Sequence, residues 1–148
     1  MKNNFKQGIY KPMNSKKYIG KGYPTYRSGW ELAVFRMCDN HPGILGWGSE
    51  THSIPYRNPL TGRPSRYVPD LLMVYHDRAG QKHAEMVEIK PSKQILGEAK
   101  TQQQKMAAVL NQAKWEAARA WCRKHGLGFR VLTEREIFNK PQNSKRKK

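Results

Sequence analysis

Apolar residues recur along the first part of the chain at helical spacing. Ser28 is a typical helix N-cap, and Glu31 in the following turn completes the pattern of a capping box. The apolar residues that follow fall on one side of a helix, and Asn-His-Pro-Gly at 40–43 ends the pattern. We therefore predict a helix over residues 29–40.

Three segments with strand-like composition follow this helix. We expect strands over residues 49–56, 66–75 and 82–90. The sequence Leu-Leu-Met-Val-Tyr at 71–75 is apolar on both faces, which is typical of a central strand. Asp-Arg-Ala-Gly at 77–80 predicts a tight turn that joins the second and third strands as a hairpin.

The last third of the chain returns to helical spacing. A long amphipathic helix is predicted over residues 98–125, a strand follows over 128–132, and Thr133 begins a last short helix. The order αβββαβα predicts an α/β domain in which a mixed central sheet, with three antiparallel strands and one parallel strand, is flanked by helices. The apolar stripe of the long helix consists of Met106, Leu110, Ala113, Ala117, Ala120 and Trp121.

The charge balance narrows the choice of partner. The formal net charge is +17 at pH 7, and the pI is about 10.1. This charge favours a polyanion partner, and nucleic acid fits better than a membrane surface because the charge is not confined to one amphipathic helix. Charge that serves solubility alone is the alternative. No apolar run approaches the ~18 residues of a membrane span, so no membrane contact is expected.

The basic residues gather toward the two ends. Seven Lys or Arg residues precede Glu31, which is the first acidic residue. We expect residues 1–27 to form an extended basic arm, residues 28–139 a single domain and residues 140–148 a disordered basic tail. Both ends suit contacts with a phosphate backbone. A localisation signal is the alternative for the tail.

Candidate chemistry lies at one edge of the predicted hairpin. Asp70 precedes the central strand, and Glu88 and Lys90 stand at the end of the neighbouring strand. These two residues are two positions apart, so their side chains share a face. Counting outward from the turn places Asp70 opposite Glu88. Two converging carboxylates, with the carbonyl of Ile89 as a third oxygen, suit Mg²⁺. Lys90 beside such an ion would counter the charge that develops during phosphodiester cleavage.

Each of these signals is weak alone. An aspartate after Pro69 is often only a turn residue, and Glu-X-Lys on a strand is often a solvated face. The combination is stronger, because the charged residues stand among the apolar residues of the two strands. The residues favour metal-dependent phosphodiester cleavage and leave a structural pairing of charges as the alternative.

Two further patterns have competing interpretations. The pairs Cys38/His41 and Cys122/His125 have the composition of a zinc site, although buried free cysteines are the commoner case and two cysteines favour a reducing cytosol. Trp115 lies off the apolar stripe of the long helix. It either stacks on a base or packs against the sheet.

The motifs together resemble a known family. Pro69-Asp70 with Glu88-Ile89-Lys90 resembles the PD-(D/E)XK nuclease superfamily, whose restriction-endonuclease-like αβββαβ core matches the predicted order. The similarity is greatest to the head completion nucleases of large tailed, T-even-like bacteriophages and covers residues 10–135. It rests also on Lys-Tyr-Ile-Gly at 17–20, Tyr-Arg-Ser-Gly-Trp-Glu at 26–31, Trp-Gly-Ser-Glu at 47–50, Ile-Pro-Tyr at 54–56 and Arg-Tyr-Val-Pro-Asp at 66–70.

This resemblance implies a Mg²⁺-dependent DNA endonuclease, with Mn²⁺ as a substitute, that acts near the end of head filling. It implies Asp70 and Glu88 as metal ligands, Lys90 as the catalytic lysine, and Glu31 as an auxiliary ligand or an orienter of water. Double-stranded DNA is the expected substrate, and phage portal or neck proteins are further candidate partners. The expected location is the host cytoplasm, with the virion as a second one.

Arg27 and Glu50 each have two possible roles. Arg27 either binds phosphate or pairs with Glu31, and Glu50 is expected to hold Arg27 or Arg66. The residues expected to contact DNA are Lys16, Lys17, Lys21, Arg27, Arg66, Lys93, Lys145, Arg146, Lys147 and Lys148.

Two other functions remain open at this point. The endonuclease subunit of heteromeric transposases shares much of the motif set, but it usually carries a further domain. A structural plug that binds DNA or the portal, with a dormant nuclease site, is the second alternative.

Overall fold

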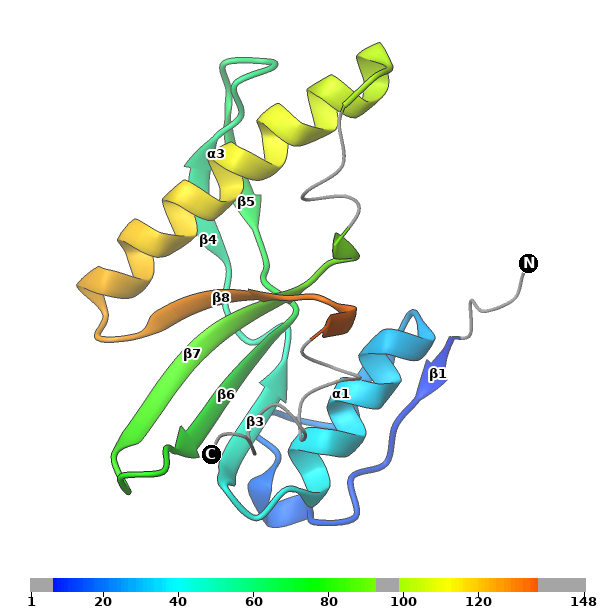
Figure 1. Ribbon diagram of the computed structural model, residues 1–148, viewed down its shortest axis with the longest axis vertical. Coiled ribbons are helices and arrows are strands. Elements are labelled where there is room, and N and C mark those ends of the chain that lie inside the picture. Colours follow the sequence, from blue (N-terminus) through cyan, green and yellow to red (C-terminus); the bar gives the residue numbers. More distant parts are fainter. Residues whose placement is uncertain (1–6, 93–98, 136–148) are drawn as a thin grey trace.

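The computed structural model describes residues 7–92 and 99–135 and has the predicted α/β architecture (Figure 1). Its elements are β1 (Gly8–Ile9), the short 3-10 helix η1 (Ser15–Lys17), β2 (Thr25–Tyr26), α1 (Gly29–Asn40), β3 (Ile44–Ser49), β4 (Ile54–Arg57), β5 (Pro64–Tyr67), β6 (Leu71–His76), β7 (Lys82–Ile89), α3 (Gln102–Lys124) and β8 (Gly128–Leu132). The central sheet has the order β3-β6-β7-β8. Its strands are antiparallel except β8, which runs parallel to β7, so the core order is αβββαβ as predicted.

The first strand of this core is not the predicted one. β3 covers Ile44–Ser49, whereas the strand predicted over 49–56 survives only at its end as β4, which pairs with β5 in a separate two-stranded sheet. Glycines made 44–49 a poor strand candidate. The tertiary structure needs Gly48 because a Cβ there would lie 2.6 Å from the carbonyl oxygen of Ile19, which runs beside β3.

The second predicted strand is also divided. Residues 66–75 separate into the end of β5 and most of β6, with a break at residues 68–70. Pro69 lies in this break and is buried. Because proline has no N–H for a sheet ladder, the chain leaves one sheet there and enters the other. The predicted hairpin between 75 and 82 is confirmed, with Gly80 N–H donating to the Asp77 carbonyl at 3.0 Å.

The central strand β6 is covered on both faces, as its apolar run predicted. Leu71 and Met73 pack with Val34 and Phe35 of α1. Leu72 points the other way and packs with Cys122 of α3 in a separate cluster. Figure 1 shows α1 and α3 on opposite sides of the sheet. No helix in the described ranges is long and apolar enough to span a lipid bilayer.

The apolar stripe predicted for the long helix faces the core only in part, since Trp121 packs against two buried clusters while Met106 does not. α3 begins after a capping box made by Thr101 and Gln104, and its buried side chains are Trp115, Ala118 and Cys122. Met106 is 42% exposed, because the first half of α3 extends past the sheet alongside the β4–β5 hairpin (Figure 1). Trp115 therefore packs inside the protein and is not a platform for a base.

Residues 7–27 are folded against the domain, which differs from the extended arm that was expected. The rings of Tyr10 and Tyr18 lie 6.1 and 4.8 Å from that of Trp47, and Ile19 N–H donates to the Trp47 carbonyl at 2.7 Å. The many basic residues of this segment had suggested a solvated arm. Its interleaved aromatic side chains bury enough surface to dock it.

A fully buried carboxylate fastens this segment. Asp39 accepts hydrogen bonds from the Tyr10 hydroxyl at 2.5 Å and from the backbone N–H groups of Met13 and Asn14 at 2.7 and 3.0 Å. Burial by itself would raise the pKa of Asp39, but these hydrogen bonds outweigh it and lower the pKa. Lys17 adds bonds to the carbonyls of Asp39 and His41 at the end of α1.

Candidate active site

The two predicted carboxylates lie side by side at one edge of the central sheet. Leu71 pairs with Val87, so Asp70 and Glu88 are the next residues outward on neighbouring strands. Asp70 Oδ2 accepts a hydrogen bond of 2.7 Å from the backbone N–H of Ile89. This bond ties the loop before β6 to the end of β7, which is where sequence reasoning expected the site.

Glu88 is held between a buried tyrosine and a lysine. Its Oε1 accepts a hydrogen bond of 2.7 Å from the Tyr67 hydroxyl, and its Oε2 lies 3.4 Å from Lys90 Nζ. The side chains of Lys90 and Glu88 are only 21% and 12% exposed. The Lys90 N–H donates to the Leu132 carbonyl, so the lysine is fixed to the end of β8. Solvent therefore screens this pair less than an ordinary surface pair.

The electrostatics of Asp70 are those of a crowded acidic site. Burial raises the pKa of Asp70 to about 7, and the charges of Glu88 and Glu31 act in the same direction. The Ile89 N–H and the Lys90 charge oppose this rise. A carboxyl group that is buried beside another carboxylate is the environment that a bound cation relieves.

The donor set fits a hard divalent cation. Asp70, Glu88 and the carbonyl of Ile89 offer oxygen atoms, which Mg²⁺ and Mn²⁺ prefer, and water would complete the coordination. Within residues 7–92 and 99–135, no three His, Cys, Asp or Glu side chains gather into a metal cluster. Glu31, expected as a further ligand, is thus not gathered with Asp70 and Glu88. The structure offers two protein carboxylates rather than a closed cage.

Glu31 connects the start of α1 to this edge in another way. Ser28 Oγ caps the helix by accepting from the Glu31 N–H at 3.1 Å, which confirms the predicted N-cap but not the reciprocal half of the predicted capping box. The Glu31 carboxylate accepts from the backbone N–H of Arg27 at 2.8 Å, one residue before the N-cap. Its negative charge still raises the pKa of Asp70. Glu31 therefore lies near the carboxylate pair while its Oε1 is bonded to the backbone.

Glu50 pairs with Arg27, which decides between its two expected partners. Glu50 Oε2 lies 2.6 Å from Arg27 Nη1, and the Glu50 backbone N–H donates to the Asp70 carbonyl at 2.9 Å. Arg66 instead bonds the hydroxyl and carbonyl oxygens of Ser53. The hydrogen bond and the charge of Glu50 raise the pKa of Arg27, and Glu31 and Asp70 contribute further.

The backbone of Glu50 is unusual. Its φ is +51°, the one positive φ of a non-glycine residue within the described chain. This left-handed conformation costs roughly 1–2 kcal/mol for an L-residue. The Arg27 and Glu50 side chains are 53% and 41% exposed, and an ion pair this open contributes at most about 1 kcal/mol. The pair therefore does not add net stability beyond the cost of the backbone.

The residues expected to contact DNA fall into three groups. Lys16, Lys21, Arg27 and Arg66 are exposed. Lys17 is engaged at the end of α1, so its ammonium serves the fold. Lys93, Lys145, Arg146, Lys147 and Lys148 lie outside the described residues.

The two Cys-x-x-His pairs are not brought together. Cys38 lies in the cluster under α1, and Cys122 lies with Leu72 and Met86 on the other face of the sheet. Burial raises the pKa of the Cys38 thiol to about 12, which disfavours the thiolate that zinc needs. Both cysteines are free and buried, which agrees with the commoner interpretation.

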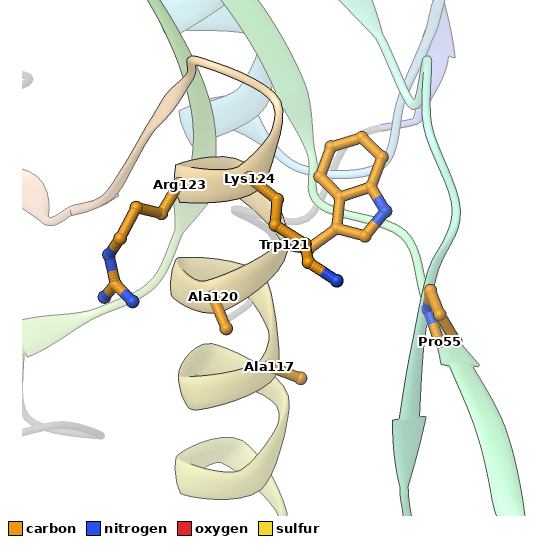
Figure 2. A pocket seen from close by; sticks show the side chains of 6 residues that line it. All are labelled: Pro55, Ala117, Ala120, Trp121, Arg123 and Lys124. Carbon is orange, nitrogen blue, oxygen red and sulfur yellow. The ribbon is translucent and has the colours of Figure 1, made fainter.

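A separate cavity of about 670 Å³ opens beside the last turns of α3 (Figure 2). Trp121 forms its aromatic side, and the His125 ring is stacked 4.0 Å from the indole. Asp70, Glu88 and Lys90 do not line this cavity, so it is distinct from the carboxylate site. Its lining consists of Pro55, Ala117, Ala120, Trp121, Arg123 and Lys124.

Sequence reasoning missed Tyr67 as part of the site. Tyr67 stood in a quoted motif, but its partner Glu88 lies 21 residues further along the chain. Tyr67 belongs to the β4–β5 sheet and Glu88 to the central sheet. No local signal connects two sheets, although a large amphipathic residue just before Pro-Asp was a hint.

The sheet edge and its residues define a class of protein. An αβββαβ sheet that presents Pro69-Asp70 beside Glu88-Ile89-Lys90 is the arrangement of a PD-(D/E)XK-type nuclease. A family model described as the N-terminal part of TnsA-like endonucleases matches residues 41–134. The chain therefore belongs to the TnsA-like endonuclease family. It is also similar to the head completion nuclease of Enterobacteria phage T4, at 37% identity over 139 residues that cover 86% of this chain and 90% of that protein.

Proposed function

We propose that this protein is a divalent-metal-dependent DNA endonuclease that hydrolyses phosphodiester bonds during completion of a phage head. The observation that carries the proposal is that Asp70 and Glu88 lie opposite each other where the loop before β6 meets the end of β7, with Lys90 beside Glu88. The similarity along nine tenths of the T4 head completion nuclease supports this role over that of a transposase subunit. The intact carboxylate pair supports an active enzyme over a dormant plug.

Asp70, Glu88 and the Ile89 carbonyl would hold Mg²⁺, with Mn²⁺ as a substitute. When bound, the ion polarises the phosphate and lowers the pKa of water. The protein contributes rigidity, because Ile89 N–H fixes Asp70 and Tyr67 fixes Glu88. Ligands held in this way need little reorganisation when substrate arrives.

Lys90 supplies positive charge where negative charge develops during cleavage. Its ammonium group lies 3.4 Å from Glu88 Oε2 and the Lys90 side chain is four-fifths buried, so its field acts at short range in a poorly screened site. Glu31, near Asp70 and not gathered with it, suits the orientation of water better than direct ligation.

Double-stranded DNA is the proposed substrate. A net charge of +17 attracts any DNA, and exposed Lys16, Lys21, Arg27 and Arg66 offer phosphate contacts that fix position without selecting sequence. Portal or neck proteins of the phage are proposed as further partners. The proposed place of action is the host cytoplasm during head assembly, with the virion as a second location.

A cleavage assay with matched variants tests this function. The purified protein is incubated with linear and branched DNA in Mg²⁺, in Mn²⁺ or in EDTA. Asp70→Asn and Glu88→Gln should each lower cleavage by at least about a thousandfold, because a removed ligand has no substitute, while DNA binding persists. Glu85→Gln on the same strand changes a carboxylate bonded to Tyr75 and Arg130, and it should cut normally.

The outcome that contradicts the proposal is equally definite. If Asp70→Asn and Glu88→Gln cut DNA at the rate of the parent, the carboxylate pair is not the active site. If the parent binds DNA but does not cut any substrate with either metal, the dormant plug is the better description.

A further inference from the structure

The strained backbone of Glu50 lies at the boundary of the proposed active site. Glu50 follows β3 directly, and its N–H bonds the carbonyl of Asp70, a proposed metal ligand. Its left-handed φ turns the chain out of the central sheet at this point. Strain of this kind persists where the surrounding structure requires it and often marks a functional site.

The Glu50 side chain does not stabilise the fold enough to explain why a glutamate occupies this strained position. Its ion pair with Arg27 is half exposed, and the energies of the pair and of the backbone roughly cancel. Glycine would adopt the same φ without cost and would lose only the carboxylate. The carboxylate therefore has a purpose that the stability of the fold does not explain.

That carboxylate fixes the direction of one guanidinium group. Arg27 is tied at both ends: its backbone N–H bonds Glu31, and its Nη1 bonds Glu50 at 2.6 Å. A guanidinium has five N–H donors, and the bond to Glu50 occupies one nitrogen. The Arg27 side chain is 53% exposed, and the residue that holds it, Glu50, is itself bonded through its N–H to the Asp70 carbonyl at 2.9 Å, so the guanidinium is anchored next to the carboxylate site and open to a phosphate.

We infer that Glu50 is a positioning residue for DNA cleavage. It holds the Arg27 guanidinium beside the carboxylate pair, where Arg27 binds the non-bridging oxygens of the phosphate that is cut. The planar fork of Arg27 suits two phosphate oxygens and gains strength as their charge increases in the transition state. This inference rests on the proposed nuclease function and assigns a role to a residue outside the PD-(D/E)XK motif.

The decisive variants are Glu50→Gly and Arg27→Gln. Glu50→Gly relieves the backbone, so its melting temperature should equal or exceed that of the parent, yet kcat should fall by about tenfold to a hundredfold with KM changed by less than about threefold. Arg27→Gln should lower kcat by about a hundredfold or more. The double variant should be no slower than Arg27→Gln alone, because Glu50 acts only through Arg27.

Charge provides a second discriminating readout. Removing a surface carboxylate near DNA should by simple electrostatics strengthen DNA binding and leave or raise the rate. A fall in kcat with Glu50→Gly therefore points to lost orientation. Asp77→Asn is the matched control, since it removes the charge of another exposed pair, with His83, at the hairpin turn, and it should cut at the rate of the parent.

Each other result overturns the inference. If the parent cuts and Glu50→Gly cuts equally well, the nuclease function stands and the positioning role fails. The role also fails if Glu50→Gly loses rate only in proportion to lost folded protein, or if KM rises while kcat stays constant. If the parent does not cut with either metal while Glu50→Gly stays folded, the proposed function fails and the role fails with it.

Discussion

Tyr67 and Glu88 come from two different sheets and meet in one hydrogen bond of 2.7 Å. The Tyr67 ring is 5% exposed and packs in a cluster with Trp115 and Ile54. The hydroxyl is therefore a rigid donor that leaves Glu88 Oε2 directed toward Lys90. The β4–β5 hairpin, which lies outside the αβββαβ core, thus reaches into the proposed metal site.

Tyr67→Phe tests this relationship. The ring remains, so the fold should persist, but the Glu88 carboxylate loses its fixed donor and the cleavage rate should fall by about 10–100-fold. Tyr75→Phe is a matched control, because Tyr75 donates to Glu85 at 2.9 Å on the same strand. Equal cleavage rates for the two variants would show that Tyr67 has no role at the site.

Lys90 should affect chemistry and not metal binding. Lys90→Ala keeps both carboxylates and should lower kcat by about two to four decades, and Lys90→Arg should restore only part because its guanidinium is larger and planar. Single-turnover cleavage together with Mn²⁺ titration measures the two effects. A collapse of metal affinity in Lys90→Ala would argue against this role, and Lys82→Ala at the start of β7 is the control.

Metal binding should stabilise the folded protein by mass action. At a Mg²⁺ or Mn²⁺ concentration about 100 times Kd, the gain is ~2.7 kcal/mol, which for a domain of this size raises Tm by roughly 5–10 °C. Differential scanning fluorimetry measures the shift. Asp70→Asn and Glu88→Gln should each abolish it, whereas a shift that survives in both variants would place the metal elsewhere.

Asp39 should make stability depend on acid pH. Its pKa is lowered in the folded protein, so its contribution is complete above the unfolded value near pH 4 and is lost as pH falls through the lower folded value. Asp39→Asn should cost roughly 2–3 kcal/mol between pH 5 and 8. That difference should shrink below about pH 4, and a difference constant down to pH 2.5 would show that the charge is not responsible.

The two ends of the chain should behave differently on truncation. Deleting residues 1–21 removes Tyr10, Lys17 and Tyr18, which pack on α1 and Trp47, so the remaining domain should be destabilised. Deleting residues 140–148 removes five basic residues and should flatten the salt dependence of DNA affinity by up to about 4.5 in the log–log slope. A tail deletion with an unchanged slope would indicate that the tail does not contact DNA.

Short-range features of the fold could be predicted from the sequence. The turn at 77–80 sets the register of β6 and β7, and the two-residue period of strands then places Asp70 opposite Glu88. Ser28 and Glu31 likewise mark the start of α1 within one helical turn. Each of these predictions depends on residues that are close in sequence or joined by one tight turn, so local geometry is enough.

Only the tertiary structure decided how separate segments meet. Glycine-rich β3 became a core strand by pairing with β6, and its Gly48 leaves space for the Ile19 backbone. The buried side of α3 depended on where the sheet ends beneath it. The pairing of Glu50 with Arg27 required β3 and the start of α1 to converge. Sequence alone was enough to propose Asp70, Glu88 and Lys90 as the residues that carry the chemistry. Packing between distant segments selected the partners that orient them, because those contacts depend on how whole elements dock and have no period along the chain.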